Sequence, residues 1–367
     1  MPTPDSADAA ASGPAQAPAL SVVVVTHNSA AEIAHTLPAI VAELRAGDEL
    51  IVADNLSTDA GAELARRLAP GAHVIERGVN DGFGAGANAG AGLASNELLL
   101  FLNPDALVAP GFRDAIELPI VEARGWQAWQ GLLTAADETL VNTWGGAIHF
   151  TGIAWAGGAE RPLSEAPAEP QQVPFASGGC LAILRQSFEE VGGFDPTYFL
   201  YHEDTDLSLR LRLAGGSVGL EPRARADHDY EFSKGAHKWR YLEQNRWATI
   251  IRTYPATLLV LLAPALAATE LALLLVATLG GWLPEKLNAS AATLAALPRL
   301  LRERRLIRRG AEGWGPGSQI SAADFGAQLT PSLDSEYLGR AADSALLEAV
   351  LGGYWAVVKA VLGPPSS

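Results

Sequence analysis

The sequence predicts an α/β fold with a mostly parallel central sheet, and three observations indicate it. Short apolar runs alternate with segments of helical spacing through the first hundred residues. Three of these runs end at a polar side chain, namely Asn28, Asp54 and Asp105. The composition, 49% hydrophobic and 18% charged over 367 residues, is that of a chain that buries a core. Ligands of such sheets bind beyond the carboxyl ends of the strands, so these three residues mark a candidate site.

Each expected strand is an apolar, largely β-branched run bounded by turn residues, and each expected helix repeats apolar residues at helical spacing. In chain order we expect strands at 20–25, 49–53, 72–76, 97–102 and 181–184, and helices at 31–44, 60–68 and 203–214. Between them, residues 126–174 are irregular and rich in Gly and Trp. Trp126, Trp129, Trp144 and Trp155 are core residues in the favoured interpretation and a sugar-stacking face in the alternative.

Charge and composition exclude several classes of protein. The net charge of −15 argues against a general nucleic-acid binder, whose affinity depends on neutralising phosphates. The single cysteine excludes a disulfide framework and a multi-cysteine metal site. Residues 1–19 are rich in Pro, Ala and Ser and predict a disordered tail. They contain neither the basic region nor the apolar region of a secretory signal, so we expect a cytoplasmic catalytic part.

The composition changes after Tyr254. Residues 256–282 are almost uninterruptedly apolar, and residues 284–312 contain seven basic and three acidic side chains. This pairing suits the anionic cytoplasmic leaflet, so 255–312 is predicted to be a helical membrane-associating segment. Pro264 is expected to break or kink the run, and Glu270 would be costly at mid-depth, which favours an embedded hairpin or an interfacial helix pair over one clean span. A buried helical subdomain with a solvated arginine face is the alternative. Residues 313–367 predict a linker and C-terminal helices.

A Gly-rich loop at 80–92 opens a predicted helix, and its small residues allow the backbone to approach a ligand closely. Residues 84–89 also fit the loose dinucleotide-binding fingerprint, which leaves a Rossmann-type oxidoreductase as an alternative. That interpretation assigns no role to Asp54 or to the acidic cluster Glu203, Asp204 and Asp206. One of these three acids is explained by a favourable position at a helix N-terminus, but three within four positions are explained less well.

Six motifs in one order carry a resemblance to a known family. They are SVVVVTHN at 21–28, VADNLSTD at 52–59, the glycine loop, FLNPD at 101–105, SGG at 177–179, and GGFD at 192–195 followed by YHEDTDLSLR at 201–210. Over roughly residues 20–250 the chain resembles inverting nucleotide-sugar glycosyltransferases of family 2, which have a GT-A fold, and most of all their rhamnosyltransferase-like branch. That branch shows Asn-Pro-Asp where others show Asp-x-Asp. Asn103 therefore removes one carboxylate from the metal site.

The resemblance implies a role for each matching residue. Nucleotide-sugar binding falls to Thr26, Asn28, Asp54, Asn80, Gly82, Asn88 and Asn103, and binding of Mg²⁺ or Mn²⁺ to Asp105 and His228. Asp204 is implied to be the general base, and Glu203 to position the acceptor or the helix. Arg246 is open to either a phosphate contact or a salt bridge.

The implied reaction is transfer of a sugar, rhamnose as the first expectation, from a dTDP- or UDP-linked donor. The expected acceptor is a hydroxyl of a cell-surface or polyprenyl-linked glycan. Domain 20–254 would then act as a peripheral or monotopic enzyme at the cytoplasmic face of the cell membrane. A catalytically inactive nucleotide-sugar-binding protein is the alternative. A sugar-nucleotide pyrophosphorylase is disfavoured, because the basic glycine-rich loop directly after the first strand is missing.

Overall fold

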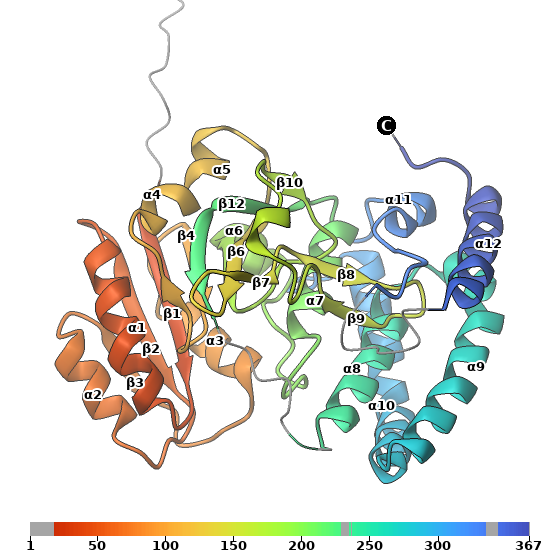
Figure 1. The fold of residues 1–367 in the computed structure, drawn as a ribbon, viewed down its shortest axis with the longest axis horizontal. Helices are drawn as coiled ribbons and strands as arrows, with labels where there is room; N and C mark the ends of the chain where they lie inside the picture. The colour runs from red at the N-terminus through yellow and green to blue at the C-terminus, as the bar shows by residue number, and fades with distance from the viewer. Residues whose placement is uncertain (1–17, 229–234, 236, 335–343, 367) are drawn as a thin grey trace, which may run out of the picture.

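The structure is a computed structural model that describes residues 18–228, 235, 237–334 and 344–366, so most of the predicted tail lies outside the described residues. One mixed sheet crosses the molecule, and long helices gather on the side opposite α1 (Ala30–Glu43) and α2 (Gly61–Leu68) (Figure 1). The spatial strand order is β10-β12-β6-β11-β4-β1-β2-β3, with β5 on β12 and β7 on β6. The α/β class predicted from the sequence is confirmed.

The strands of this sheet are β1 (Leu20–Thr26), β2 (Glu49–Asp54), β3 (His73–Glu76), β4 (Leu98–Leu102), β5 (Leu107–Val108), β6 (Ala128–Ala135), β7 (Leu140–Thr143), β10 (Gln171–Gln172), β11 (Cys180–Leu184) and β12 (Val218–Asp227). The pairs β4-β1, β1-β2, β2-β3 and β12-β6 are parallel, whereas β11 runs antiparallel between β4 and β6. Strands β8 (Gly146–Ile148) and β9 (Ala154–Ala156) form a separate hairpin.

The register of the parallel half brings the expected polar residues to one edge of the sheet. Thr26 pairs with Asp54 across β1 and β2, and Val24 pairs with Leu102, the last residue of β4. Because β4 is buried along its whole length, Asn103 is the first residue after it that can reach a ligand.

Helices cover both faces of the sheet. One apolar core lies between the sheet and α1, α2 and α4 (Phe112–Ile116), which short α5 (Leu118–Val121) follows. The other lies between the sheet and α3 (Phe83–Ala91), α6 (Arg185–Glu190) and α7 (Glu203–Leu213). The 3₁₀ turn Leu163–Glu165 lies within the irregular segment predicted from the sequence.

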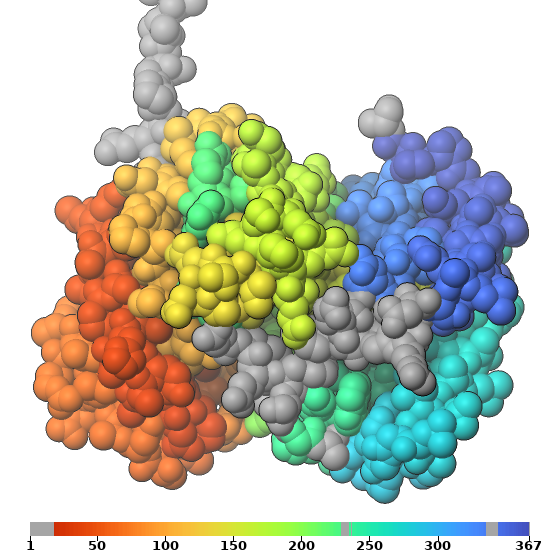
Figure 2. All heavy atoms as spheres, viewed as in Figure 1, coloured from red at the N-terminus to blue at the C-terminus, as the bar shows by residue number. Residues whose placement is uncertain are grey.

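The C-terminal part is a helical layer whose apolar core is shared with β8 and α7. It contains α8 (Lys238–Thr253), α9 (Ala256–Leu279), α10 (Leu283–Arg309), α11 (Ala322–Gly326) and α12 (Ala345–Leu362). Leu258, Leu262 and Leu266 of α9 face the interior and pack with Trp355 and Val358 of α12. Figure 2 shows α9 in cyan and α12 in blue along one edge of the molecule.

The expected break at Pro264 is absent, because α9 continues through it from Ala256 to Leu279. Pro264 is exposed, so its ring lies on the outer side of the helix while the buried leucines keep their spacing on the inner side. The two long helices α9 and α10 are joined by residues 280–282 into a helical hairpin.

Candidate active site

A cavity of about 670 Å³ lies beyond the carboxyl ends of β1 and β4, between the sheet and the C-terminal helices. Its size is typical of a pocket for a small-molecule ligand. Nine of the residues predicted from the sequence line it, and these are Thr26, Asn28, Asn80, Gly82, Asn103, Asp105, Glu203, Asp204 and His228. Folding therefore gathers residues as far apart in the sequence as Thr26 and His228 around one space.

Asp54 and Asn88 are absent from the cavity wall. Asp54 is buried at the end of β2, where its carboxylate accepts hydrogen bonds from the Thr26 hydroxyl (3.1 Å) and the Ser57 N–H (3.0 Å). Asn88 lies on α3, donates to the Phe194 carbonyl (2.7 Å) and accepts from the Phe194 N–H (3.0 Å). Both side chains thus hold neighbouring loops in place, and Asn55, which the sequence did not single out, lines the cavity next to Asp54.

The glycines of the predicted loop serve packing as much as ligand approach. Gly82 precedes α3 with a φ of +96°, and a Cβ there would lie 2.2 Å from the Phe199 carbonyl oxygen. Gly86 and Gly90 lie on the face of α3 that packs on β1, where a Cβ would come within 2.6 Å of Val25 and 2.4 Å of Val23. Small residues therefore let α3 pack closely on the sheet. This packing explains why the glycines have the spacing of the dinucleotide-binding fingerprint without requiring a bound dinucleotide.

Asp105 and His228 form the cavity's candidate metal-binding pair. His228 Nε2 lies 3.1 Å from Asp105 Oδ1 and 3.2 Å from Asn103 Nδ2. Asn142 of β7 donates to the His228 carbonyl oxygen (2.8 Å) and so fixes the end of β12. Across the described residues, no cluster of three or more His, Cys, Asp or Glu side chains is arranged to hold a metal ion. One carboxylate and one imidazole are a partial ligand set of the kind that substrate phosphates and water complete around Mg²⁺ or Mn²⁺.

Asp204 and Glu203 begin α7 and lie in the cavity wall. The Asp204 carboxylate accepts hydrogen bonds from the N–H groups of Gly178 (3.1 Å) and Thr205 (2.7 Å). Burial nevertheless raises the pKa of Asp204. Burial, together with the neighbouring Asp204 charge, also raises the pKa of Glu203 to about 8. A carboxylate whose pKa is raised towards neutrality is suited to accept a proton from a hydroxyl group.

The backbone just before α7 is held in an unusual conformation. Tyr201 and His202 both have left-handed φ values, +70° and +67°, which cost roughly 1–3 kcal/mol each for residues other than glycine. Asn245 of α8 holds this turn by donating to the carbonyls of Leu200 (2.9 Å) and Tyr201 (2.8 Å). The strained turn aims the first residues of α7 at the cavity.

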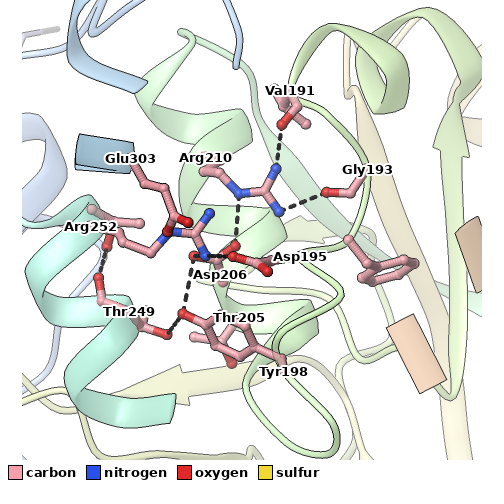
Figure 3. Close-up of polar contacts among 12 residues, drawn as sticks. Val191, Gly193, Asp195, Tyr198, Thr205, Asp206, Arg210, Thr249, Arg252 and Glu303 are labelled. Atoms are coloured by element: carbon pink, nitrogen blue, oxygen red, sulfur yellow. Dashed lines mark hydrogen bonds and ion pairs between the residues drawn. The ribbon is translucent and has the colours of Figure 1, made fainter. Parts of the chain in front are cut away.

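The third acid of the cluster, Asp206, is not part of the cavity wall. It accepts from Arg210 (2.7 Å) and lies 3.1 Å from Arg252 of α8, which also contacts Asp195 and Glu303. We call Asp195, Asp206, Arg252 and Glu303 the Arg252 cluster (Figure 3). Through it α7, the loop before α7, α8 and α10 are joined by buried ion pairs.

A second ionic group joins α9 to the cavity. We call it the Glu270 cluster, and it consists of Glu243, Arg246, Glu270 and Lys286. Glu270 accepts hydrogen bonds from Trp247 Nε1 (3.0 Å) and Lys286 (2.7 Å), and from Arg246. Glu243 binds the same Arg246 and Lys286, and both Glu243 and Arg246 line the cavity. Arg246 is therefore a salt-bridge residue, and the mid-helix acid that was expected to be costly in a membrane is neutralised inside the protein.

The aromatic residues divide between core and cavity. Trp126 and Trp129 are buried in the core, and Trp144 packs on it, as the favoured interpretation expects. Trp155 instead lines the cavity, together with Trp239 and Trp282, which the sequence did not single out. No local pattern marks these last two residues, because the cavity wall they form exists only once the C-terminal helices have packed.

Residues 21–192 match the family described as Glycosyl transferase family 2. These residues form a family 2 glycosyltransferase domain. Two rhamnosyltransferases are among its relatives. The N-acetylglucosaminyl-diphospho-decaprenol L-rhamnosyltransferase of Mycobacterium tuberculosis (strain H37Rv) is 28% identical over 257 residues, which are 63% of this chain and 83% of that protein. Rhamnosyltransferase WbbL of Escherichia coli (strain K12) is 35% identical over 85 residues, 20% of this chain and 32% of that protein.

A solved structure supports the GT-A fold of this chain. A structure of GalNAc-T7 with UDP, GalNAc and Mn²⁺ aligns with a TM-score of 0.53 at 19% identity, over 65% of this chain and 48% of that chain. At that level of identity the likeness concerns the fold. The oxidoreductase alternative is set aside, since the family match includes the glycine-rich segment on which it rested.

Proposed function

We propose that this glycosyltransferase is metal-dependent and inverting, and that it moves a sugar from a pyrimidine nucleoside diphosphate to an acceptor hydroxyl. The observation that carries the proposal is that one cavity holds both Asp204, with its raised pKa, and the Asp105–His228 pair. The two rhamnosyltransferase relatives favour rhamnose on dTDP, with UDP-linked sugars as the next choice.

The donor's nucleotide would lie at the end of the cavity formed by the loops after β1 and β2. Thr26, Asn28 and Asn55 line that end, and Asn28 is itself held by the Thr58 N–H (2.7 Å). Asp54 lies directly behind Thr26, so it would act by holding the Thr26 hydroxyl or by turning toward the base ring N–H. Asn80 and Gly82 place the loop before α3 beside the same space.

Asp105 and His228 would hold Mg²⁺ or Mn²⁺, with donor phosphate oxygens and water as the other ligands. The bound ion would neutralise the negative charge that develops on the departing nucleoside diphosphate. Asn103 replaces a charged ligand with a neutral amide, so Asp105 would be the main acidic ligand of the site.

Asp204 would take the proton from the acceptor hydroxyl as that oxygen attacks the anomeric carbon. One base facing one leaving group gives a single displacement, so the configuration at that carbon is inverted without a covalent sugar–enzyme intermediate. Within the described residues, Glu203 Oε2 is buried in the wall without a hydrogen-bond partner. It is therefore placed to bind a second acceptor hydroxyl and to keep the first one in line with Asp204.

We further propose that the acceptor is a glycan carried on a lipid and that the enzyme works at a membrane surface. The Mycobacterium relative is named for a decaprenol-linked acceptor. Helices α9 and α12 are long and apolar enough to cross a membrane. Only 11% of the 18-residue apolar stretch of each helix is buried inside the protein. The large apolar side chains on their outer surfaces are Val260, Leu271, Leu275, Val276 and Leu279 on α9, and Leu346, Val350, Val357 and Val361 on α12.

The basic segment supports surface binding in part. Four of its seven basic side chains make ion pairs or hydrogen bonds within the protein. Lys286 belongs to the Glu270 cluster, and Arg299 pairs with Glu303. Arg304 and Arg308 donate hydrogen bonds to backbone carbonyls of α8. The other three, Arg302, Arg305 and Arg309, are exposed and follow helical spacing along one face of α10. That face fits anionic headgroups, while Glu270 anchors α9 to the protein, so we propose that α9 lies on the bilayer rather than spans it.

Asp204→Asn tests the chemistry. A panel of dTDP- and UDP-sugars is assayed for hydrolysis and transfer with Mn²⁺, Mg²⁺ or a chelator, and nucleotide affinity is measured separately. We expect Asp204→Asn to lower turnover at least 100-fold and to leave nucleotide affinity within about threefold, since the loss of a general base costs roughly 10²–10⁴ in rate. Asp114→Asn, at a side chain that is 78% exposed, is the matched control. Wild type that binds sugar nucleotides but turns none of them over would support the binding-protein alternative instead.

A further inference from the structure

The cavity has one part, formed by residues of the C-terminal helices, that the donor and the catalytic residues leave unused. Its walls there are Trp239 and Leu242 of α8, Leu273 of α9 and Trp282 of the link between α9 and α10. The only polar groups on these four side chains are the two indole N–H groups of the tryptophans. We call this apolar part of the wall the Trp282 end. Glu243 and Arg246 of α8 line the same cavity but are ion-paired with each other, and Glu243 also pairs with Lys286, so the four side chains of the Trp282 end are themselves poorly suited to a sugar or a phosphate.

The Trp282 end is a built surface rather than a gap. The rings of Trp239 and Trp282 stack with centroids 4.9 Å apart and planes at 17°. Trp282 is buried, and its backbone N–H donates to the Ala277 carbonyl (3.0 Å), which fixes the link at the end of α9. The wall therefore has a defined shape before any ligand binds.

The Trp282 end is continuous with the outer surface of α9. Leu273 lies in the cavity wall, and Val276 and Leu279, three and six residues further along the helix, are 52% and 80% exposed. An apolar chain that leaves the cavity past Leu273 would meet these exposed apolar side chains of α9. This is the outer surface that the proposed function assigns to the bilayer.

We propose that the Trp282 end binds the first isoprene units of a polyisoprenoid acceptor, whose sugar reaches Asp204 while its remaining chain passes over α9. The proposal rests on the proposed function and adds to it the place and the residues of lipid recognition. A branched, unsaturated hydrocarbon matches this site, because stacked indoles and leucines gain affinity by taking apolar surface out of water.

The test uses the full chain with Mn²⁺ and UDP or dTDP already bound, so that the donor site is occupied. Calorimetry then compares farnesyl diphosphate with methyl diphosphate, which has the same head group and no isoprene. We expect the farnesyl ester to bind at least tenfold more tightly. Leu273→Asn should weaken the binding of farnesyl diphosphate about tenfold and leave the affinity for the nucleotide unchanged. Leu271→Asn, on the same helix but 69% exposed, should have no effect on either.

Equal affinity for the two esters would overturn the proposal. So would equal losses in Leu271→Asn and Leu273→Asn, because they would indicate adhesion to the outer surface alone. Leu242→Asn in the facing wall gives a second measurement if Leu273→Asn loses nucleotide binding through misfolding. Failure of the proposed function would be distinct, since it would be seen as absent nucleotide binding or turnover in wild type.

Discussion

The Arg252 cluster makes a quantitative prediction about stability. Arg252 is 1% exposed, and its guanidinium lies 2.5 Å from Asp195, 3.1 Å from Asp206 and 3.2 Å from Glu303. Arg252→Met keeps most of the side-chain volume but removes the charge. The variant therefore leaves three buried carboxylates around an apolar side chain.

The expected cost follows from what each carboxylate retains. Breaking a buried ion pair by removing one partner costs about 3–5 kcal/mol. Asp206 keeps Arg210 at 2.7 Å, and Glu303 keeps Arg299 at 2.8 Å, whereas the nearest cation left to Asp195 is Arg299 at 3.9 Å. Only one carboxylate loses its close partner, so we expect a loss near the lower limit, about 3 kcal/mol.

Urea unfolding followed by circular dichroism measures this loss, with Arg299→Met as the matched control. Arg299 belongs to the same network but is 37% exposed, so its removal should cost less than about 1 kcal/mol. Burial alone would raise the pKa of Asp195, but Arg252 and the Thr197 N–H hold it below the ordinary value. The stability that this interaction supplies is present above the unfolded-state pKa and is lost as pH falls, so the effect of Arg252→Met should shrink near pH 3. An Arg252→Met cost no larger than that of Arg299→Met at pH 7 would refute the reasoning.

Three other substitutions test the site. Gly82→Ala should lower the melting temperature and abolish nucleotide binding, because its Cβ would lie 2.2 Å from the Phe199 carbonyl oxygen; unchanged binding by calorimetry would contradict the assigned packing. Burial raises the pKa of Glu203 from 4.5 to about 8, so Glu203→Gln should raise thermal stability increasingly from pH 5 to pH 8 and leave it unchanged below pH 4.5; a gain equal at pH 4 and pH 8 would count against this. Asp105→Asn should raise the Mn²⁺ concentration needed for half-maximal turnover at least tenfold, and a wild-type rate that a chelator leaves intact would remove the metal from the mechanism.

The first half of the sheet could be predicted closely from the sequence. Strands β1, β2 and β4 begin and end within one residue of the expected positions, because each is a continuous apolar run closed by a polar residue. The irregular segment at 126–174 could not be resolved in this way. Strands β6 and β10 of this segment pair with β12, which lies far along the chain, and a local pattern carries no record of that partner.

The roles of individual polar residues were harder to predict than their presence. Asp204 and Asp206 are two residues apart on one helix, yet they point to the cavity and to the Arg252 cluster respectively. From the sequence alone, Glu270 is expected to destabilise an apolar helix in a membrane. In the structure its charge is paired with Arg246 and Lys286, which are 24 and 16 residues away in the sequence. Ion pairs between helices are set by packing, so a sequence window around either partner does not contain them.

The Glu270 cluster bears on how the chain can be divided. Shortening it to end near Tyr254 would delete Leu273 and Trp282 and open one side of the cavity. The same cut would leave Glu243 with Arg246 alone and Arg246 without Glu270. The hairpin of α9 and α10 is thus part of the wall of the candidate active site, and a fragment made by trimming it should not be expected to report the acceptor preference of the whole chain.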